Sequence, residues 1–599
     1  MEECKMKIIK KIFHSIGNIF YLFNPFWTNG KAYMLGQFFT ALIILPVERV
    51  LYVALQKYII DSLAAGHLFL QIIIGILSFS LGMMALELFD SIFFNAYGLK
   101  KYITIRGLVD KENYKKSIKT DYKYFDDPEF YDNYTYAINE RSGKAEQARL
   151  LIIRFMATAM TIISISAMIA SSKWPIILII VATFCISTFI SNKSMEINHQ
   201  KYLEQIPLDR KSGYIHQLFY NKNYAADLKV NRSSDFLFKH YDSVLGDKVE
   251  LFKKYQFKTV FINAVSIVIE DLSEIAISIY LVYLIINNEL SIGGFASMLT
   301  AAGLLKSNMG EFFDLIPRSN ELSIYADKIK QFYNLPSKIE ESDGKKQPGS
   351  GSFAVEFDNV GFKYNNSEFE LKNISMKINA GEKIAIVGEN GVGKTTLTKL
   401  LLRLYDVEKG EIRLNGTPLP DYDLSSVRNR IGIASQTPLV YAIPLSENMQ
   451  LYNDKSPEQL TEILKELQLT SILENPNVSL STELTKEFDK DGIVLSQGET
   501  QKLGLSRLLY GDFGLLILDE PSSSLDPIAE YELTKMIFNQ SNKATTIMIA
   551  HRLSTIRDAD EIFLVDNGVI KEHGTHDELM AKKGKYYDMF TKQAENYVK

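Results

Sequence analysis

The residues of this sequence best suited to chemistry form a glycine-rich loop. The loop reads Gly388, Glu389, Asn390, Gly391, Val392, Gly393, Lys394, Thr395 and Thr396. It follows an apolar run that ends at Val387 and precedes a helical pattern, the context in which backbone amides at a helix start bind phosphate oxygens. We expect Lys394 to contact the β- and γ-phosphates of a nucleotide and the Thr395 hydroxyl to ligate Mg²⁺.

Two carboxylates follow a second apolar run, at residues 515–518. A buried parallel strand presents its polar residues at its carboxyl end, so Asp519 and Glu520 are expected at the edge of a sheet. We predict that Asp519 holds Mg²⁺ through water and that Glu520 orients or deprotonates the attacking water. Solvated acids at a strand end are the alternative, which the phosphate loop upstream disfavours.

Between these elements lies the run Leu495, Ser496, Gln497, Gly498 and Glu499. With the phosphate loop before it and the acidic strand after it, this run resembles the signature of ATP-binding-cassette (ABC) ATPases, Leu-Ser-Gly-Gly-Gln. Gln497 and Glu499 depart from that pattern, and Ser496 and Gly498 match it. The resemblance implies that Ser496 and the following helix start contact the γ-phosphate of ATP bound on a partner subunit. Glu499 would add negative charge near that phosphate.

Four more positions match motifs of the same family in order. The resemblance implies that Tyr364 stacks on adenine and that Gln436 touches Mg²⁺ and senses the membrane region. It also implies that Asp526 lies in a loop coupling two ATP sites, and that His551 contacts the γ-phosphate as a catalytic switch beside Glu520. Taken singly, Tyr364 is equally well a core residue, Gln436 a loop residue and His551 the end of a strand.

These residues need a soluble α/β scaffold. Strand-like runs at 383–387, 431–434, 515–518 and 546–549 alternate with helical patterns, which predicts a parallel sheet covered by helices. A polar stretch with Pro, Gly and Ser at 335–352 is typical of a linker. We therefore predict three parts, namely a transmembrane domain at 1–334, the linker, and an ABC ATPase domain at 353–599.

The first part carries six apolar runs long enough to cross a bilayer. They are residues 33–55, 68–85, 150–170, 174–190, 257–286 and 293–316. The segments 100–149 and 192–254 are long and rich in Lys and Arg, so the positive-inside rule places them and both termini in the cytoplasm. The predicted fold class is a membrane bundle of six transmembrane helices fused to an α/β ATPase domain, which the resemblance identifies as the ABC exporter type.

Three other features of the chain bear on its setting. The lysine-rich start has apolar residues at helical spacing, which predicts either a helix in the membrane interface or one packed on the protein. A net charge of −5 and a pI near 6.0 provide no basic face for nucleic acid. Cys4 and Cys185 lie too far apart in the sequence to indicate a disulfide framework or a zinc cluster.

The resemblance implies an ATP-driven exporter with ATP and Mg²⁺ as cofactors. One chain holds one phosphate loop and one signature, which the family pairs across subunits, so we expect a homodimer. The abundance of Lys, Ile, Asn and Tyr indicates a low-GC bacterium and hence the cell membrane. A peptide, such as an antimicrobial or modified peptide, is the first cargo hypothesis. A multidrug exporter, a lipid flippase and an ATP-gated sensor remain alternatives. A peptidase domain ahead of the first span is not expected, because only about thirty residues precede Tyr33.

Charged residues inside the predicted spans are costly in a membrane and point to a cavity. They are Glu48, Arg49, Glu270, Asp271, Glu274, Glu311 and Asp314. We expect these side chains to line a wet cavity, to pair with one another, or to lie where helices leave the membrane. The excess of acids favours a cargo with a positive or strongly hydrogen-bonding group. Simple solvation beyond the membrane is the alternative, above all for Glu311 and Asp314.

Overall fold

The computed structural model of the chain describes residues 2–221, 224–231, 233–339, 345–364, 368–452, 454–469, 472, 474–521, 527–540, 544–550 and 552–598. The chain forms two compact units. One comprises Met1–Lys115 and Asp132–Asn334, and the other comprises Lys116–Tyr131 and Leu335–Lys599. The short segment Lys116–Tyr131 therefore packs with the C-terminal half of the chain although it lies early in the sequence.

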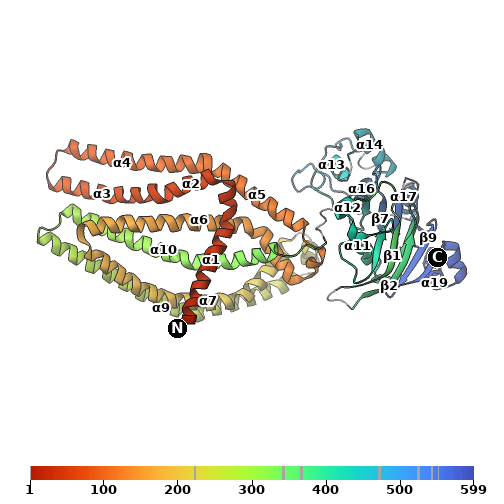
Figure 1. The fold of residues 1–599 in the computed structure, drawn as a ribbon, viewed down its shortest axis with the longest axis horizontal. Coiled ribbons are helices and arrows are strands. Elements are labelled where there is room, and N and C mark those ends of the chain that lie inside the picture. The colour runs from red at the N-terminus through yellow and green to blue at the C-terminus, as the bar shows by residue number, and fades with distance from the viewer. Residues whose placement is uncertain are drawn as a thin grey trace. The chain divides into compact units, whose positions relative to one another are not determined.

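The first unit is built of helices (Figure 1). In chain order they are α1 (Glu2–Asn29), α2 (Lys31–Phe39), the π-helical η1 (Thr40–Ile44), α3 (Leu45–Ala64), α4 (Phe69–Ile92), the π-helical η2 (Phe93–Gly98), α5 (Leu99–Ile118), α6 (Pro128–Lys173), α7 (Pro175–Tyr220), α8 (Ala225–Val230), α9 (Ser233–Ile286) and α10 (Ile292–Tyr333). The last residues of α5 and the first of α6 belong to the second unit.

Within the described residues, three helical stretches are long and apolar enough to cross a membrane: Lys31–Ala64, Phe69–Ile118 and Ala137–Lys173. A shorter apolar helix covers Pro175–Ile190. The other two predicted spans lie in α9 and α10, where acidic residues interrupt the apolar sequence, so the number six stays a prediction. At 46 residues α6 is about 69 Å long, more than twice the hydrocarbon core of a bilayer. Such helices extend well beyond the membrane.

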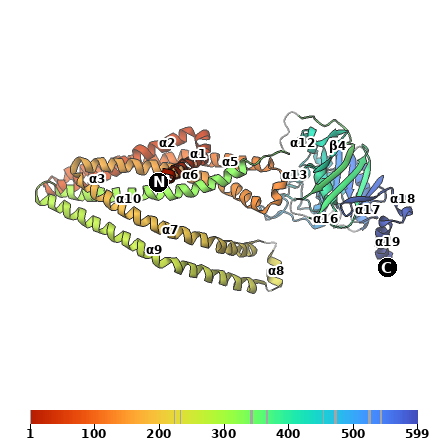
Figure 2. The same ribbon diagram turned by 60° about the horizontal axis from the view of Figure 1, so that its bottom comes forward.

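Helices α7 and α9 run side by side along much of their length, and α8 joins their far ends (Figures 1 and 2). Beyond the apolar part, ion pairs hold the two helices together. Lys254 of α9 lies 2.8 Å from Glu204 of α7, and Lys248 lies 2.8 Å from Asp209. Residues 225–230 thus form a short helix at the tip of this hairpin.

Helix α1 packs on α10 through polar side chains. The amide of Asn18 donates to the Ser323 hydroxyl at 2.8 Å, and His14 lies 3.0 Å from the carboxylate of Asp327. The opposite side of α1 keeps its apolar residues exposed: Ile12, Phe13, Ile16 and Phe20. The helix therefore contacts the protein, as one alternative predicted, and still presents an apolar face; its place in the membrane interface stays a prediction.

The second unit contains two sheets and their helices. The six-stranded sheet has the order β10-β9-β3-β8-β7-β6, and the four-stranded antiparallel sheet has the order β2-β1-β4-β5. The strands are β1 (Val355–Lys363), β2 (Glu370–Ile378), β3 (Lys383–Val387), β4 (Lys409–Leu414), β5 (Thr417–Pro418), β6 (Ile431–Ala434), β7 (Leu515–Asp519), β8 (Thr545–Ile549), β9 (Glu561–Asp566) and β10 (Val569–Gly574). The helices are η3 (Tyr122–Asp126), α11 (Lys394–Leu401), η5 (Leu419–Asp421), α12 (Leu424–Arg428), α13 (Leu445–Met449), α14 (Pro457–Glu466), α16 (Gln497–Ser506), α17 (Pro527–Gln540), α18 (His576–Lys582) and α19 (Lys585–Val598).

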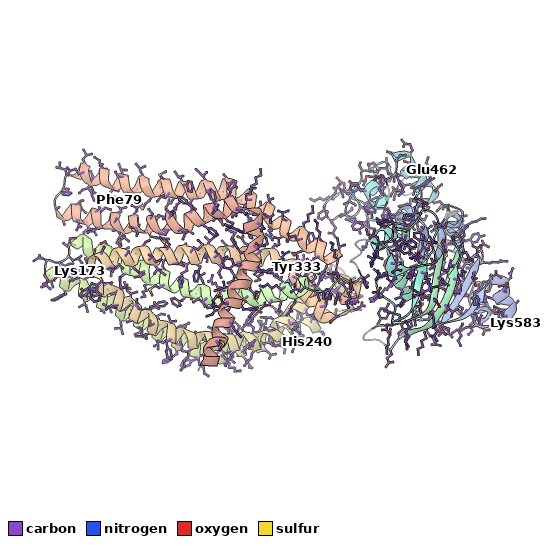
Figure 3. All side chains as sticks on the ribbon, viewed as in Figure 1. Phe79, Lys173, His240, Tyr333, Glu462 and Lys583 are labelled. Carbon is purple, nitrogen blue, oxygen red and sulfur yellow. The ribbon has the colours of Figure 1, made fainter. Side chains whose placement is uncertain are left out.

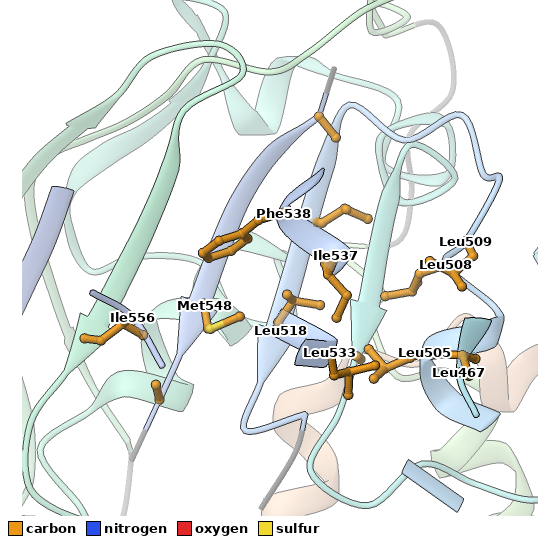
Figure 4. Packing of buried hydrophobic residues seen from close by; sticks show 14 of the residues in the cluster. Leu467, Leu505, Leu508, Leu509, Leu518, Leu533, Ile537, Phe538, Met548 and Ile556 are labelled. Carbon is orange, nitrogen blue, oxygen red and sulfur yellow. The ribbon is translucent and has the colours of Figure 1, made fainter. Parts of the chain in front are cut away.

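The four strands predicted from the sequence are β3, β6, β7 and β8, and they are parallel. Their side chains are buried on both faces, which explains why these strands read as continuous apolar runs. On one face, Leu518 of β7 and Met548 of β8 belong to the same buried cluster as Ile537 and Phe538 of α17 (Figure 4). This core fixes the carboxyl ends of the strands, where the candidate residues lie.

Candidate nucleotide site

The phosphate loop joins β3 to α11 and has backbone angles that glycine alone adopts without strain. Gly388 and Gly393 have φ values of 150° and 106°. A Cβ on Gly388 would lie 2.2 Å from the carbonyl oxygen of Val565, so a larger residue would displace the strand behind the loop. The fold thus holds the loop close against the sheet, with the start of α11 directly behind it.

Lys394 is buried at the first position of α11. Its ammonium donates to the carbonyl oxygens of Gly388 at 2.8 Å and of Glu389 at 2.9 Å, and so it lies folded over the loop. Burial lowers the pKa of Lys394, while the carboxylates of Glu520 and Asp519 act in the opposite direction. A buried cation held at a helix start and beside two acids is well placed to meet a polyphosphate.

The two carboxylates lie at the carboxyl end of β7, as predicted. Asp519 is the last residue of that strand, and the amide of Glu520 donates to Ile549 of β8 at 3.0 Å. The side-chain amide of Gln436 donates to the Glu520 carboxylate at 2.8 Å, and Gln501 binds the Gln436 carbonyl at 3.2 Å. Gln436, which the sequence alone left open as a simple loop residue, therefore contacts the predicted catalytic carboxylate.

A cavity of about 260 Å³ opens beside these residues. Asn390 of the phosphate loop, Gln436 and Glu520 line it, together with an ion pair between Arg552 and Glu530 at 2.6 Å. The sequence analysis did not single out this pair, since nothing local links positions 22 residues apart. Asp526 and His551, which the sequence analysis placed in the site, lie outside the described residues.

The predicted signature residues begin helix α16. Ser496 caps the helix: its hydroxyl accepts from the amide of Glu499 at 3.3 Å, and the Glu499 carboxylate accepts from the amide of Ser496 at 2.7 Å. This reciprocal capping box satisfies two amides that the helix itself leaves without partners. Gln497 and Gly498 follow as the first helical residues. Glu499, which differs from the family signature, thus stabilises the start of α16 in addition to contributing a negative charge.

Tyr364 lies at the rim of a buried aromatic cluster. Its hydroxyl is 3.2 Å from that of Thr396 on α11, and its ring packs edge-on against Tyr405 with centroids 5.3 Å apart. Tyr405 in turn packs edge-on against Tyr122 of η3 at 5.6 Å, and its hydroxyl donates to the Asp126 carboxylate. Burial and then this hydrogen bond raise the pKa of Tyr405.

This cluster connects the phosphate helix to the loop Tyr122–Asp126, which comes from between two helices of the first unit. The residue before this loop holds the start of the predicted linker: the Asp121 carboxylate accepts from the amides of Lys338 and Ile339, at 3.2 and 3.1 Å. The sequence analysis gave no sign of the contact with Tyr405, which lies 279 residues from Asp126.

The sequence of this chain is similar to those of known proteins. Residues 371–523 match the family described as ABC transporter. The subtilin transport ATP-binding protein SpaT of Bacillus subtilis is 29% identical over 560 residues, covering 93% of this chain and 90% of that protein. Residues 371–523 therefore form an ABC transporter domain.

Other relatives of this ABC transporter match mainly one half of it. The ATP-dependent lipid A-core flippase of Escherichia coli is 35% identical over 265 residues, which cover 44% of this chain and 45% of that protein. The solved structure of a bacterial Atm1-family ABC exporter with ATP bound has a TM-score of 0.72 and 20% identity, covering 94% of this chain and 98% of that one. The fold is that of an ABC exporter half-transporter, a helical membrane region fused to an ATPase domain that binds ATP and couples its hydrolysis to transport.

Proposed function

We propose that two copies of this ABC transporter form a homodimer that exports a peptide across the cell membrane. The proposal of a dimer rests on one observation. The residues that line the cavity at Glu520 include Asn390 of the phosphate loop but not Ser496. Ser496 instead makes its cap contacts within its own helix. A second copy would supply the helix start of α16 that a single chain leaves out of its own site.

The residues of the unit suit Mg·ATP. The loop with positive φ at Gly388 and Gly393 presents amides to phosphates, and Lys394 adds a buried cation beside them. Thr395, Gln436 and Asp519 would hold Mg²⁺, which supplies neutralisation of phosphate charge when bound. Within the described residues no group of three or more His, Cys, Asp or Glu side chains forms a metal site of its own. That composition suits a cation held largely by phosphate oxygens.

In this proposal Glu520 orients or deprotonates the water that attacks the γ-phosphate. Gln436 holds the Glu520 carboxylate by a hydrogen bond and so connects it to the loop after β6. Tyr364 stacks on adenine at the edge of the aromatic cluster, and Ser496 and Gly498 of the partner contact the γ-phosphate. His551 and Asp526 complete the set, as the switch and the link between the two sites.

The contact from Tyr364 through Tyr405 to Asp126 provides a route by which nucleotide binding reaches the membrane helices. Tyr122 and Asp126 lie between α5 and α6, so movement of η3 is transmitted covalently to two helices. Closing and reopening of the dimer would then switch the helix bundle between two states that face opposite sides of the membrane. Both termini and the tips of the long hairpins would be cytoplasmic.

A peptide cargo is supported by the relative SpaT, whose name states subtilin transport and whose match covers nearly the whole chain. Lipid A-core flippases match over about half of it, which leaves lipid or drug export as the alternative. Transport into sealed inverted vesicles tests the proposal with a labelled peptide, ATP and the Glu520→Gln variant as control. ATP-dependent uptake supports peptide export. ATP hydrolysis without any uptake would indicate a sensor instead.

A further inference from the structure

A cavity of about 790 Å³ lies inside the helical unit, between α7, α9 and α10. Its volume falls within the range of pockets that hold small molecules, so it accommodates a short peptide segment but no folded protein. The wall is largely apolar and includes the rings of Phe184 on α7 and Phe313 on α10, whose centroids lie 4.5 Å apart. This cavity is separate from the nucleotide residues and needs its own explanation.

The charged side chains of the wall are mostly acidic. Three acids, Glu270 and Glu274 of α9 and Asp314 of α10, face a single base, Lys306, which leaves a net charge of −2 from three acids and one base. Lys306 lies 3.4 Å from Glu270. Among the residues that the structure describes, neither Glu274 nor Asp314 makes an ion pair within 4 Å. Glu270 and Glu274 are one helical turn apart, a spacing at which like charges repel.

A second observation also points to a ligand. Ser187 of α7 lines the cavity, is 8% exposed, and its hydroxyl has no hydrogen-bond partner in the described part of the chain. Buried hydroxyls in native proteins nearly always have a partner, because an unsatisfied one destabilises the fold. An unsatisfied hydroxyl in the same cavity wall as two carboxylates without ion pairs is expected where a bound molecule supplies the missing contacts.

We infer that this cavity binds an apolar ligand segment bearing at least one ammonium or guanidinium group. Glu274 and Asp314 attract the cation, Ser187 hydrogen-bonds to it or to a neighbouring amide, and the faces of Phe184 and Phe313 favour a positive group over a neutral one. The inference rests on the proposed export of a peptide and specifies its class: a cationic, amphipathic peptide rather than an anionic or neutral one.

The test uses the full-length protein in nanodiscs of phosphatidylcholine, without nucleotide. The probe is a dansyl-labelled pentapeptide amide of alternating leucine and lysine, and its matched partner carries acetylated lysines. Fluorescence titration, corrected with empty nanodiscs, should show the lysine peptide binding about tenfold or more tightly than the acetylated one. Equal affinity of the two peptides for the wild-type protein would overturn the inference.

Two double variants separate the cavity from general charge effects. In the Glu274→Gln/Asp314→Asn variant, the lysine peptide should bind about tenfold or more weakly, while binding of the acetylated peptide is unchanged and so reports an intact cavity. The control Asp271→Asn/Glu311→Gln removes the same charges from the same helices at positions outside the described wall, and both peptides should bind as to the wild type. Equal weakening in both variants would overturn the inference.

Ser187→Ala adds a readout that a purely structural role would not produce. Loss of the unsatisfied hydroxyl should raise the melting temperature of the ligand-free protein and weaken binding of the lysine peptide. A variant that is more stable and binds the peptide normally would contradict a ligand contact at Ser187. Uptake assays keep this inference distinct from the proposed function: binding without ATP-driven uptake refutes export, whereas equal uptake of both peptides refutes cation recognition.

Discussion

Replacing Tyr405 with phenylalanine tests whether the aromatic cluster couples the ATPase domain to the membrane helices. The change removes one hydroxyl from a ring that is 6% exposed and leaves its packing with Tyr364 and Tyr122 in place. The lost interaction is the hydrogen bond to the Asp126 carboxylate. Hydrogen bonds to charged groups contribute about 1.5–3 kcal/mol, and because Asp126 is exposed we expect the lower end of that range.

A loss of about 1.5 kcal/mol makes undocking of the loop Tyr122–Asp126 roughly tenfold more frequent. Hydrogen–deuterium exchange of residues 116–131 measures this directly and should accelerate by about that factor. In vesicles, the number of peptides moved per ATP hydrolysed should fall, because hydrolysis continues while fewer cycles reach α5 and α6.

Tyr422→Phe is a matched control. Tyr422 is 3% exposed, and its hydroxyl donates to the Leu414 carbonyl at 2.9 Å, within the same unit but away from the loop. That variant should leave exchange of residues 116–131 unchanged.

The raised pKa of Tyr405 means that the stabilisation from its hydroxyl is complete below the unfolded pKa of about 10 and is lost only as the pH rises above it. Coupling should therefore be constant between pH 6 and 9. Normal exchange and normal coupling in Tyr405→Phe would refute this reasoning.

Three further predictions concern the nucleotide residues. Glu520→Gln should keep ATP binding and lower phosphate release by orders of magnitude; near-normal turnover would remove Glu520 from its proposed role. Mixing Lys394→Ala chains with Ser496→Ala chains places both lesions in one composite site and leaves the other whole, so partial ATPase activity in the mixture, with none in either variant alone, would support pairing across the dimer. Glu499→Gln keeps the capping box without its charge and should tighten ATP binding, whereas Glu499→Ala should in addition cost about 1 kcal/mol in stability of α16; unchanged ATP affinity in Glu499→Gln would contradict a role for the charge.

Much of the ATPase scaffold could be predicted because its signals are local. The buried strands at residues 383–387 and 431–434 appear at the predicted positions, since strands covered on both faces must be apolar throughout. The capping box was also readable, because a serine followed three residues later by a glutamate is its pattern. The sequence analysis considered only the charge of Glu499, and the structure shows that this carboxylate binds the amide of Ser496.

Other contacts gave no local signal. Tyr405 and Asp126 are separated in the sequence by helices α6–α10, the linker and the segment from β1 to α11, and only the folded chain brings them together. The π-helical segments η1 and η2 likewise lie inside apolar runs whose composition is that of ordinary helix. The sequence analysis proposed seven charged residues for a cavity, and the packing of the helices decides which of them line it. Glu270 and Glu274 share one face of α9, and Asp271, about 100° around the helix, is not on the described wall.

Helix α10 forms part of the cavity wall and continues covalently, through the linker, into the ATPase unit. It carries Lys306 and Asp314 in the cavity wall and ends at Tyr333, a residue that is labelled in Figure 3. The next residues begin the linker, where the Leu335 carbonyl accepts from Lys116 at 3.0 Å. A ligand that pairs with Asp314 and releases repulsion around Glu270 would change the preferred position of α10, and that change would arrive at the segment that also holds Asp126 against Tyr405. Stimulation of ATP hydrolysis by a cationic peptide should therefore weaken in Tyr405→Phe although neither the cavity nor the phosphate loop is altered, and full stimulation in that variant would show that α10 acts by another route.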